Sequence, residues 1–139
     1  MVEPTVTISV VVPVYREAAH LPDVLGHTRE ELDKLDEPWE IILVDDGSPD
    51  DTWSAIVRES RRIPQLRALR LSRNFGKEAA LCAGLEAAAG EAVIVMDGDG
   101  QHPPELIGEM VRTWRRTGAD VVEGRKVRHR RESLLGRCG

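Results

Sequence analysis

The residues best suited to chemistry are Asp97 and Asp99, which lie one residue apart in the run Asp-Gly-Asp-Gly-Gln. They follow the apolar residues 92–96, which are typical of a buried strand. Carboxylate oxygens are hard ligands that suit Mg²⁺ or Mn²⁺, and Gln101 adds another hard oxygen. The pattern predicts a divalent cation bound by Asp97, Asp99 and Gln101, with a nucleotide diphosphate as its partner. The alternative is that the two carboxylates only cap the next turn.

A second acidic group, Asp45-Asp46-Gly47-Ser48, follows the apolar residues 40–44. An acidic side chain there can accept hydrogen bonds from a base N–H or from ribose hydroxyls. The same residue types also favour a simple turn. A third group, near the end of the first apolar segment, consists of Pro13, Tyr15 and Glu17. These residues could frame a nucleotide base, with Tyr15 offering an aromatic ring and Glu17 a hydrogen-bond acceptor. That group could equally be an ordinary strand-to-helix connection.

Basic residues complete the candidate site. Lys77 opens a predicted helix, whose N-terminus can attract an anion, although it could also be a surface residue. Arg125 follows the last predicted strand and is a candidate phosphate clamp. Residues 121–139 hold six Lys or Arg and two Glu, a local charge of +4 in a chain of net charge −5. This segment could meet phosphate or anionic lipid headgroups, or be solvated. With aromatic residues at 4%, nucleic acid is not expected as a partner.

These residues need elements that bring them together, and the chain alternates β-branched apolar segments with helical ones. The patterns predict strands at residues 7–14, 40–44, 66–71, 92–96 and 119–123, and helices at 17–35, 51–62, 77–89 and 103–117. Such alternation predicts an α/β fold with a parallel sheet and helices on both faces. Ligands of these sheets bind beyond the carboxyl ends of the strands, where the polar groups above all lie.

Composition bounds the class of protein. The chain of 139 residues is 41% apolar and 31% charged, as expected for one globular domain. No apolar run approaches the roughly 20 residues that span a bilayer, and the start lacks a secretory pattern, so we expect a cytoplasmic protein. Cys82 and Cys138 form no CxxC pair, and we expect both to be reduced thiols.

Several other classes of site do not fit. The chain contains no P-loop motif, and no GxGxxG follows its first strand. A calcium loop starting at Asp97 would place His102 where glycine is needed and Gly108 where glutamate is needed. A haloacid-dehalogenase-type phosphatase also carries DxDG, but normally after the first strand and followed by threonine. In this chain the motif follows the fourth predicted strand and continues with Gln101.

Four stretches together resemble the family 2 glycosyltransferases of the GT-A fold: VVPVYRE, ILVDDGSPDDT, LSRNFGKEAAL and VIVMDGDGQHPPELI. Within that family they look like the polyprenyl-phosphate group, such as bactoprenol glucosyltransferases and dolichol-phosphate mannose synthases. The resemblance covers almost the whole chain in the family's order and spacing. It implies a Rossmann-like three-layer αβα sandwich with a mainly parallel sheet.

The resemblance also implies roles for single residues. Asp97 and Asp99 match the motif that holds metal and sugar nucleotide, and Gln101 matches a further metal ligand. Arg125 matches a basic residue near the diphosphate or sugar, so the expected catalytic residues are Asp97, Asp99 and Arg125. Arg131 and Arg137 lie in a segment similar to the acceptor region. Together with Lys77, the expected nucleotide-sugar-binding residues are Pro13, Tyr15, Glu17, Asp45, Asp46, Gly47, Lys77, Asp97, Gly98 and Asp99.

The chain departs from the family pattern in two ways. Gly98 and Gly100 replace the usual residues of a DAD or DADL motif, which loosens the loop but keeps both carboxylates. Family members also continue further, so the chain looks C-terminally truncated. We expect residues 1–124 to form the nucleotide-sugar-binding core and residues 125–139 to be the basic, flexible start of the acceptor side.

The activity that the resemblance implies is metal-dependent transfer of a hexose, with inversion. The donor would be a UDP- or GDP-sugar, the acceptor undecaprenyl or dolichyl phosphate, and the cofactor Mg²⁺ or Mn²⁺. The full-length protein would work at the cytoplasmic face of the membrane. Two alternatives remain: a fragment that binds nucleotide sugar without transferring it, and a family 2 enzyme with a glycan acceptor.

Overall fold

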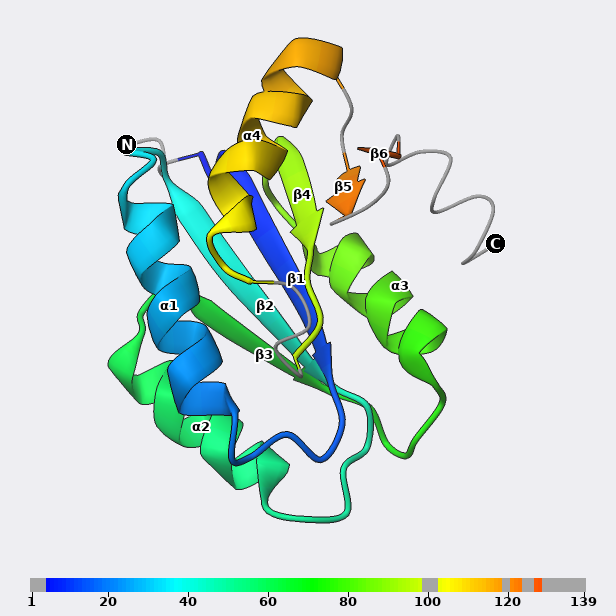
Figure 1. Ribbon diagram of the computed structural model, residues 1–139. Helices are drawn as coiled ribbons and strands as arrows, with labels where there is room; N and C mark the ends of the chain where they lie inside the picture. Colours follow the sequence, from blue (N-terminus) through cyan, green and yellow to red (C-terminus); the bar gives the residue numbers. More distant parts are fainter. Residues whose placement is uncertain (1–4, 99–102, 119–120, 124–126, 129–139) are drawn as a thin grey trace.

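The computed structural model describes residues 5–98, 103–118, 121–123 and 127–128, and a six-stranded sheet forms its centre (Figure 1). The strand order is β3-β2-β1-β4-β5-β6. All neighbours pair in parallel except β5 and β6, which are antiparallel. The strands are β1 (Ile8–Val14), β2 (Trp39–Asp45), β3 (Leu66–Arg70), β4 (Ala92–Val95), β5 (Val121–Glu123) and β6 (Val127–Arg128). The mainly parallel α/β fold predicted from the sequence is confirmed.

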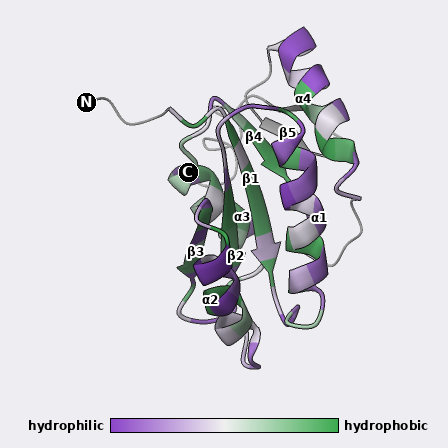
Figure 2. Ribbon diagram, turned by 90° about the vertical axis from the view of Figure 1, so that its left-hand side faces the viewer, coloured by the Kyte–Doolittle hydropathy of each residue, from purple (hydrophilic) through white to green (hydrophobic). Residues whose placement is uncertain are grey.

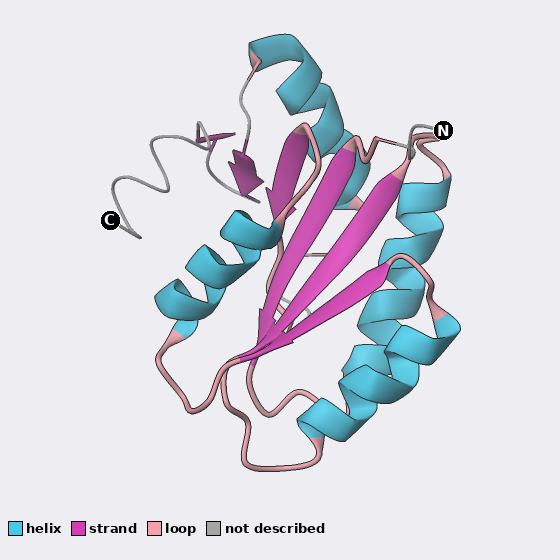
Figure 3. Ribbon diagram, turned by 180° about the vertical axis from the view of Figure 1, so that it is seen from behind, coloured by secondary structure: helices cyan, strands magenta, loops and turns pink. Residues whose placement is uncertain are grey.

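Helices cover both faces of the sheet and make three layers (Figures 1 and 3). They are α1 (Leu21–Asp33), α2 (Thr52–Arg62), α3 (Lys77–Ala87) and α4 (Leu106–Thr117). The core explains the arrangement. Val10 and Val12 of β1 pack in one cluster with residues of α1, α2 and α4, whereas Val11 packs in the other with α3. Both faces of β1 are therefore buried, which is why its sequence is apolar without alternation. In Figure 2 the central strands are mostly green, whereas helices α1 and α4 alternate purple and green residues.

The elements differ from the predictions mainly at their ends. Helix α1 begins at Leu21, four residues after its predicted start, because residues 18–20 form a turn and Pro22 lies in the first helical turn. Helix α4 likewise begins after its prolines, at Leu106. Strand β6 was not predicted, since two residues carry no periodic signal. Among the described residues, no helix has the length and apolarity needed to cross a membrane.

The expectation of a reduced thiol at Cys82 is wrong, because Cys82 is disulfide-bonded in the structure. The chain has one other cysteine, Cys138, which lies outside the described residues. A cysteine outside a CxxC pair carries no local sequence sign of whether it forms a disulfide.

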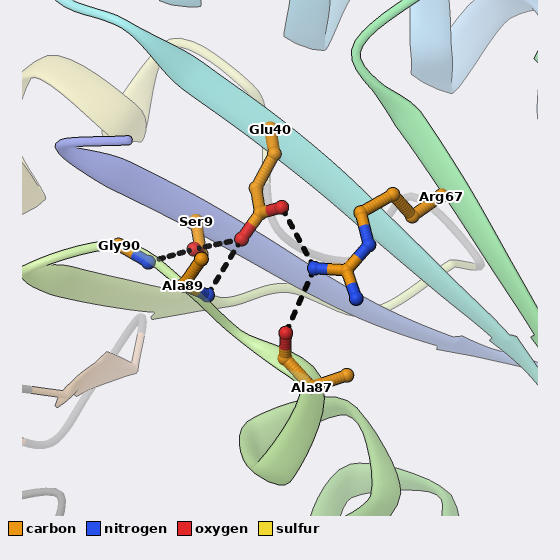
Figure 4. Close-up of polar contacts among 6 residues, drawn as sticks. All are labelled: Ser9, Glu40, Arg67, Ala87, Ala89 and Gly90. Carbon is orange, nitrogen blue, oxygen red and sulfur yellow. Dashed lines mark hydrogen bonds and ion pairs between the residues drawn. The ribbon is translucent and has the colours of Figure 1, made fainter. Parts of the chain in front are cut away.

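A polar cluster, in which Ser9 and Glu40 are buried and Arg67 is exposed, joins the amino ends of three strands to the residues that follow α3 (Figure 4). Ser9 donates a hydrogen bond of 2.6 Å to Glu40, and Arg67 donates one of 3.0 Å to the same carboxylate. The N–H of Ala89 also donates to Glu40, at 2.8 Å, and the N–H of Gly90 donates to Ser9. Burial alone would raise the pKa of Glu40, but these hydrogen bonds outweigh it and hold that pKa below its usual value. The carboxyl end of α3 is thereby fixed to the sheet.

Candidate functional site

The polar residues predicted at the strand ends do meet, at the edge of the sheet shown at the bottom of Figure 1. A pocket opens there, and its cavity volume is about 150 Å³. It is smaller than the roughly 300–1,000 Å³ of a typical small-molecule site. The lining residues are Pro13, Val14, Tyr15, Glu17, Asp46, Lys77, Asp97 and Gly98.

The loop after β1 supplies one wall of the pocket. Its backbone is tied to the loop after β2: the N–H of Arg16 donates to Ser48 and the N–H of Glu17 donates to Thr52. Arg16 adopts a φ of +55°, an uncommon conformation for a residue other than glycine. Tyr15 is 38% exposed, and the Arg16 guanidinium carbon lies 5.5 Å from the centre of the Tyr15 ring. An exposed aromatic face held on an anchored loop can stack on a flat ligand.

Asp45, at the end of β2, is completely buried. Its Oδ1 accepts a hydrogen bond of 3.0 Å from the N–H of Ser48, but its Oδ2 has no hydrogen-bond partner among the described residues. A buried carboxylate oxygen without a partner is costly, so a donor on a ligand would find it unsatisfied. Asp45 does not line the pocket as the structure shows it.

Asp46 is also buried, and both of its carboxylate oxygens accept hydrogen bonds within the fold. It accepts from the N–H of Phe75 at 2.9 Å, from the N–H of Gly76 at 3.0 Å and from the side chain of Asn74 at 3.1 Å. These three donors all belong to the loop that leads into α3. Two adjacent aspartates therefore differ: Asp45 keeps an unpaired oxygen, and Asp46 holds a loop.

Gly47 makes the close approach of these two loops possible. Its φ is +68°, and a Cβ at this position would lie 2.2 Å from the carbonyl carbon of Arg73. Only glycine fits such a conformation beside another backbone. Gly47 does not line the pocket described above; it lines a second cavity of about 390 Å³, together with Ser48, Arg70, Leu71 and Ser72.

Lys77 and Asp97 face each other across the pocket and form an ion pair. Lys77 is the first residue of α3, and Asp97 follows β4. Gly98 comes next, and a Cβ there would lie 2.5 Å from a methyl of Val14, so the turn after β4 packs directly on β1. A cation and a carboxylate in one pocket suit a ligand that carries both phosphate and metal.

Several predicted residues lie outside the described residues: Asp99, Gln101, Arg125, Arg131 and Arg137. Within the described part of the chain, no three His, Cys, Asp or Glu side chains cluster in a way that suits a metal. The donor chemistry of Asp97 does fit a hard divalent cation, since its carboxylate lies in the pocket wall. The metal set of Asp97, Asp99 and Gln101 stays a prediction.

Sequence reasoning missed the roles of Ser48 and Asn74. Both are small polar residues whose side chains tie the loops around the pocket to one another. The sequence feature that could have revealed these two residues is their position, since each lies within a few residues of a motif at a strand end. The predicted position of Lys77 at the start of a helix, by contrast, is confirmed.

The sequence matches a known protein family and several curated proteins. The family described as glycosyl transferase family 2 matches residues 9–137. An undecaprenyl-phosphate 4-deoxy-4-formamido-L-arabinose transferase from Pseudomonas syringae pv. syringae is 42% identical over 116 residues, which are 83% of this chain and 34% of that protein. The chain spans between 34% and 41% of the length of three curated relatives that it matches.

Solved structures agree with the fold. The mannosyltransferase PcManGT from Pyrobaculum calidifontis, in complex with GDP-Man and Mn²⁺, has a TM-score of 0.62 and 31% identity over 76% of this chain and 30% of that chain. TarS from S. aureus, in complex with UDP-GlcNAc, has a TM-score of 0.63 and 28% identity over 82% of this chain and 32% of that chain. The family match covers far more than half of the sequence and the fold is shared. The chain therefore belongs to glycosyl transferase family 2.

Proposed function

We propose that this chain forms the sugar-nucleotide-binding part of an inverting glycosyltransferase. The enzyme would move a hexose from a UDP- or GDP-sugar to a polyprenyl phosphate, either undecaprenyl or dolichyl. One observation carries the proposal: the loops after β1, β2 and β4 and the start of α3 meet at one pocket, where Lys77 faces Asp97. This pocket lies beyond the carboxyl ends of parallel strands, where α/β folds bind nucleotides.

The base and ribose would be held near the ends of β1 and β2. Asp45 supports this role, because its unpartnered buried Oδ2 can accept a hydrogen bond from a base N–H. Reaching it would require a base to enter between the two loops. Tyr15 offers an exposed ring for stacking, and Pro13 and Glu17 line the same wall. PcManGT binds GDP-Man and TarS binds UDP-GlcNAc, so the relatives leave both bases open.

The diphosphate would lie between Lys77 and the loop that follows β4. The Lys77 ammonium would pair with phosphate oxygens, and Arg125 would assist from the other side. Asp97, Asp99 and Gln101 would hold Mg²⁺ or Mn²⁺. That cation would supply charge neutralisation for the departing diphosphate. PcManGT, whose structure contains Mn²⁺, supports this choice of metal.

The acceptor would be a lipid-linked phosphate. The relative from Pseudomonas syringae is named for undecaprenyl phosphate. A phosphate acceptor is already anionic, so attack on the sugar needs no strong general base, and no described pocket residue is a convincing one. The basic residues from 125 onward, with Arg131 and Arg137, would bring the lipid phosphate to the sugar at the cytoplasmic face of a membrane.

A second function is favoured by the length of the chain relative to its relatives. Because it spans between 34% and 41% of their length, the chain alone could bind nucleotide sugar without transferring it. Turnover with polyprenyl phosphate by a longer protein containing this sequence, but not by residues 1–139, would support this view.

Calorimetry tests the proposal. The chain is titrated with UDP- and GDP-sugars in the presence of Mn²⁺ and again with EDTA, and the series is repeated with Asp99→Ala. We expect one of the two donors to bind, and binding to weaken strongly with EDTA and in Asp99→Ala. Glu31→Gln, which removes a carboxylate from an exposed pair on α1, is the matched control. Binding that ignores EDTA, or no binding of either donor, would overturn the account of the site.

A further inference from the structure

We propose that Asp46 is a positioning residue that acts through Lys77 rather than a ligand of the nucleotide. Its carboxylate orders the loop of residues 73–76, starts α3 at a fixed place and so directs Lys77 across the pocket to Asp97. The inference rests on the proposed function in one respect, that Lys77 binds the diphosphate of the donor.

Both carboxylate oxygens of Asp46 already accept hydrogen bonds from the loop before α3. Oδ1 lies 2.9 Å from the N–H of Phe75, and Oδ2 lies 3.0 Å from the N–H of Gly76 and 3.1 Å from Asn74 Nδ2. The residue is only 4% exposed. A carboxylate that already accepts several charge-assisted hydrogen bonds from a loop gains little by turning to a ribose or a base.

The start of α3 needs a partner from elsewhere in the fold. Its N-cap residue is Gly76, which has no side chain to accept the hydrogen bonds that Ser, Thr, Asn or Asp would. Asp46 supplies the carboxylate instead, from the end of β2, and its negative charge suits the positive end of the helix. Asp46 thereby fixes Phe75 and Gly76, the two residues directly before the first helical residue.

Lys77 is the next residue after this cap, so its backbone is placed by the same hydrogen bonds. Its side chain is 65% exposed, whereas that of Asp97 is 13% exposed. A long, largely exposed lysine has many rotamers, and the position of its backbone decides which acidic group it can reach. Loosening the loop would therefore let the ammonium leave the pocket while the rest of the fold stays intact.

Binding of Mn²⁺ with UDP or GDP to single and double variants separates the two roles. Asp46→Asn keeps the size of the side chain but offers the loop only one acceptor oxygen. We expect it to weaken binding by about tenfold, because the displaced Lys77 ammonium would lose its charge-assisted contact with the phosphate. Lys77→Met should weaken binding at least as much. If Asp46 acts through Lys77, then adding Asp46→Asn to Lys77→Met weakens binding no further. Fully additive losses would overturn the proposal, since they would mean that Asp46 contacts the ligand itself.

Asp33→Asn is the matched control. Asp33, the last residue of α1, accepts a hydrogen bond of 3.0 Å from Trp39 Nε1 at the amino end of β2, away from the pocket. Binding should be unchanged in this variant. If Asp46→Asn fails to fold, Asn74→Ala removes one of the donors and should show the same lack of additivity with Lys77→Met. Additive losses in that second pair would likewise count against the proposal.

Hydrogen exchange in the ligand-free protein keeps this inference separate from the proposed function. We expect the amide protons of Phe75 and Gly76 to exchange faster in Asp46→Asn and to be unaffected in Lys77→Met. Unchanged exchange in Asp46→Asn would overturn the positioning role. If exchange changes as expected but the native chain binds neither nucleotide, the proposed function fails while the role of Asp46 in the loop stands.

Discussion

Lys77 and Asp97 form an ion pair across the pocket, although each lies at the end of a different element. The pair places a positive charge against a carboxylate that we expect to hold metal. The ammonium and a divalent cation would compete for Asp97, and a diphosphate would attract both. Metal and nucleotide should consequently bind more strongly together than separately.

The first prediction concerns this competition. Lys77→Met should raise the affinity for Mn²⁺ alone by roughly two- to fivefold, the range expected for losing an exposed ion pair, and should weaken binding of UDP or GDP. Manganese binding is followed by electron paramagnetic resonance and nucleotide binding by calorimetry. Lys34→Met removes a lysine from an exposed pair on α1 and should change neither. If the affinities for Mn²⁺ and for the nucleotide both rise or both fall, Lys77 does not compete with the metal while binding the nucleotide.

The second prediction concerns Asp45. Asp45→Asn keeps the oxygen that accepts from Ser48 but replaces the unpartnered Oδ2 with an amide group. If that oxygen accepts from a base, nucleotide binding should fall by about ten- to a hundredfold, while stability changes by less than about 1 kcal/mol. Calorimetry and thermal unfolding measure the two effects. Unchanged binding would mean that Asp45 serves the fold alone.

The third prediction concerns the pH dependence of stability through Glu40. Its folded pKa is lowered, so the unfolded chain binds the proton more readily, and the stability that Glu40 contributes is present above its unfolded pKa of about 4.5. That contribution is lost as the pH falls through the folded pKa. Glu40→Gln should cost roughly 3 kcal/mol at pH 7, because Arg67 and the Ala89 N–H lose a charged acceptor.

Urea unfolding at pH 7, 5 and 3.5 measures this effect. The difference between the native chain and Glu40→Gln should be constant from pH 7 to about 5 and shrink below that. Glu31→Gln should leave the pH dependence close to that of the native chain, because its partner Lys34 is exposed. A difference that grows on acidification would mean that folding raises the pKa of Glu40 instead of lowering it.

The fourth prediction uses three glycines to distinguish backbone strain at positive φ from steric overlap of an added Cβ. Gly26→Ala lies in α1 with no atom within 4 Å of the added Cβ, and should stabilise by about 0.5–1 kcal/mol. Gly118→Ala meets open space but has a φ of +71°, so it should cost about 1 kcal/mol. Gly47→Ala combines a positive φ with a collision against the Arg73 backbone and should cost the most. Thermal unfolding measures the stability of the three variants. If Gly47→Ala destabilises the protein no more than Gly118→Ala does, the loops that contain Gly47 and Arg73 can move apart easily.

Much of the pocket could be predicted from the sequence because parallel strands end at the same edge of a sheet. Asp46, Lys77 and Asp97 are far apart in the sequence, but each follows a strand or opens a helix, and these points meet. Strand and helix periods place such points reliably even when the exact ends shift by a few residues.

The different uses of neighbouring residues could not be predicted. Asp45 and Asp46 are chemically the same and adjacent, yet one keeps an unpaired oxygen and the other holds the loop before α3. The difference depends on which backbone N–H groups lie close to each carboxylate. For Asp46 they belong to the loop before α3, about thirty residues further along the chain. Glu40 likewise lies in an apolar strand, with no local sign that Ser9 and Arg67 would surround it.

Two carboxylates, Glu40 and Asp46, belong to one strand and its last connection, and they hold opposite ends of α3. From residue 40 to residue 46 a strand extends about 20 Å, and from residue 76 to residue 89 a helix with a short extended end covers about the same length. The distance between Glu40 and Asp46 along β2 therefore fixes the length that α3 must have for both of its ends to be held. Inserting or deleting a single residue within α3 should release one of the two ends, and release of the first end would carry Lys77 away from the pocket.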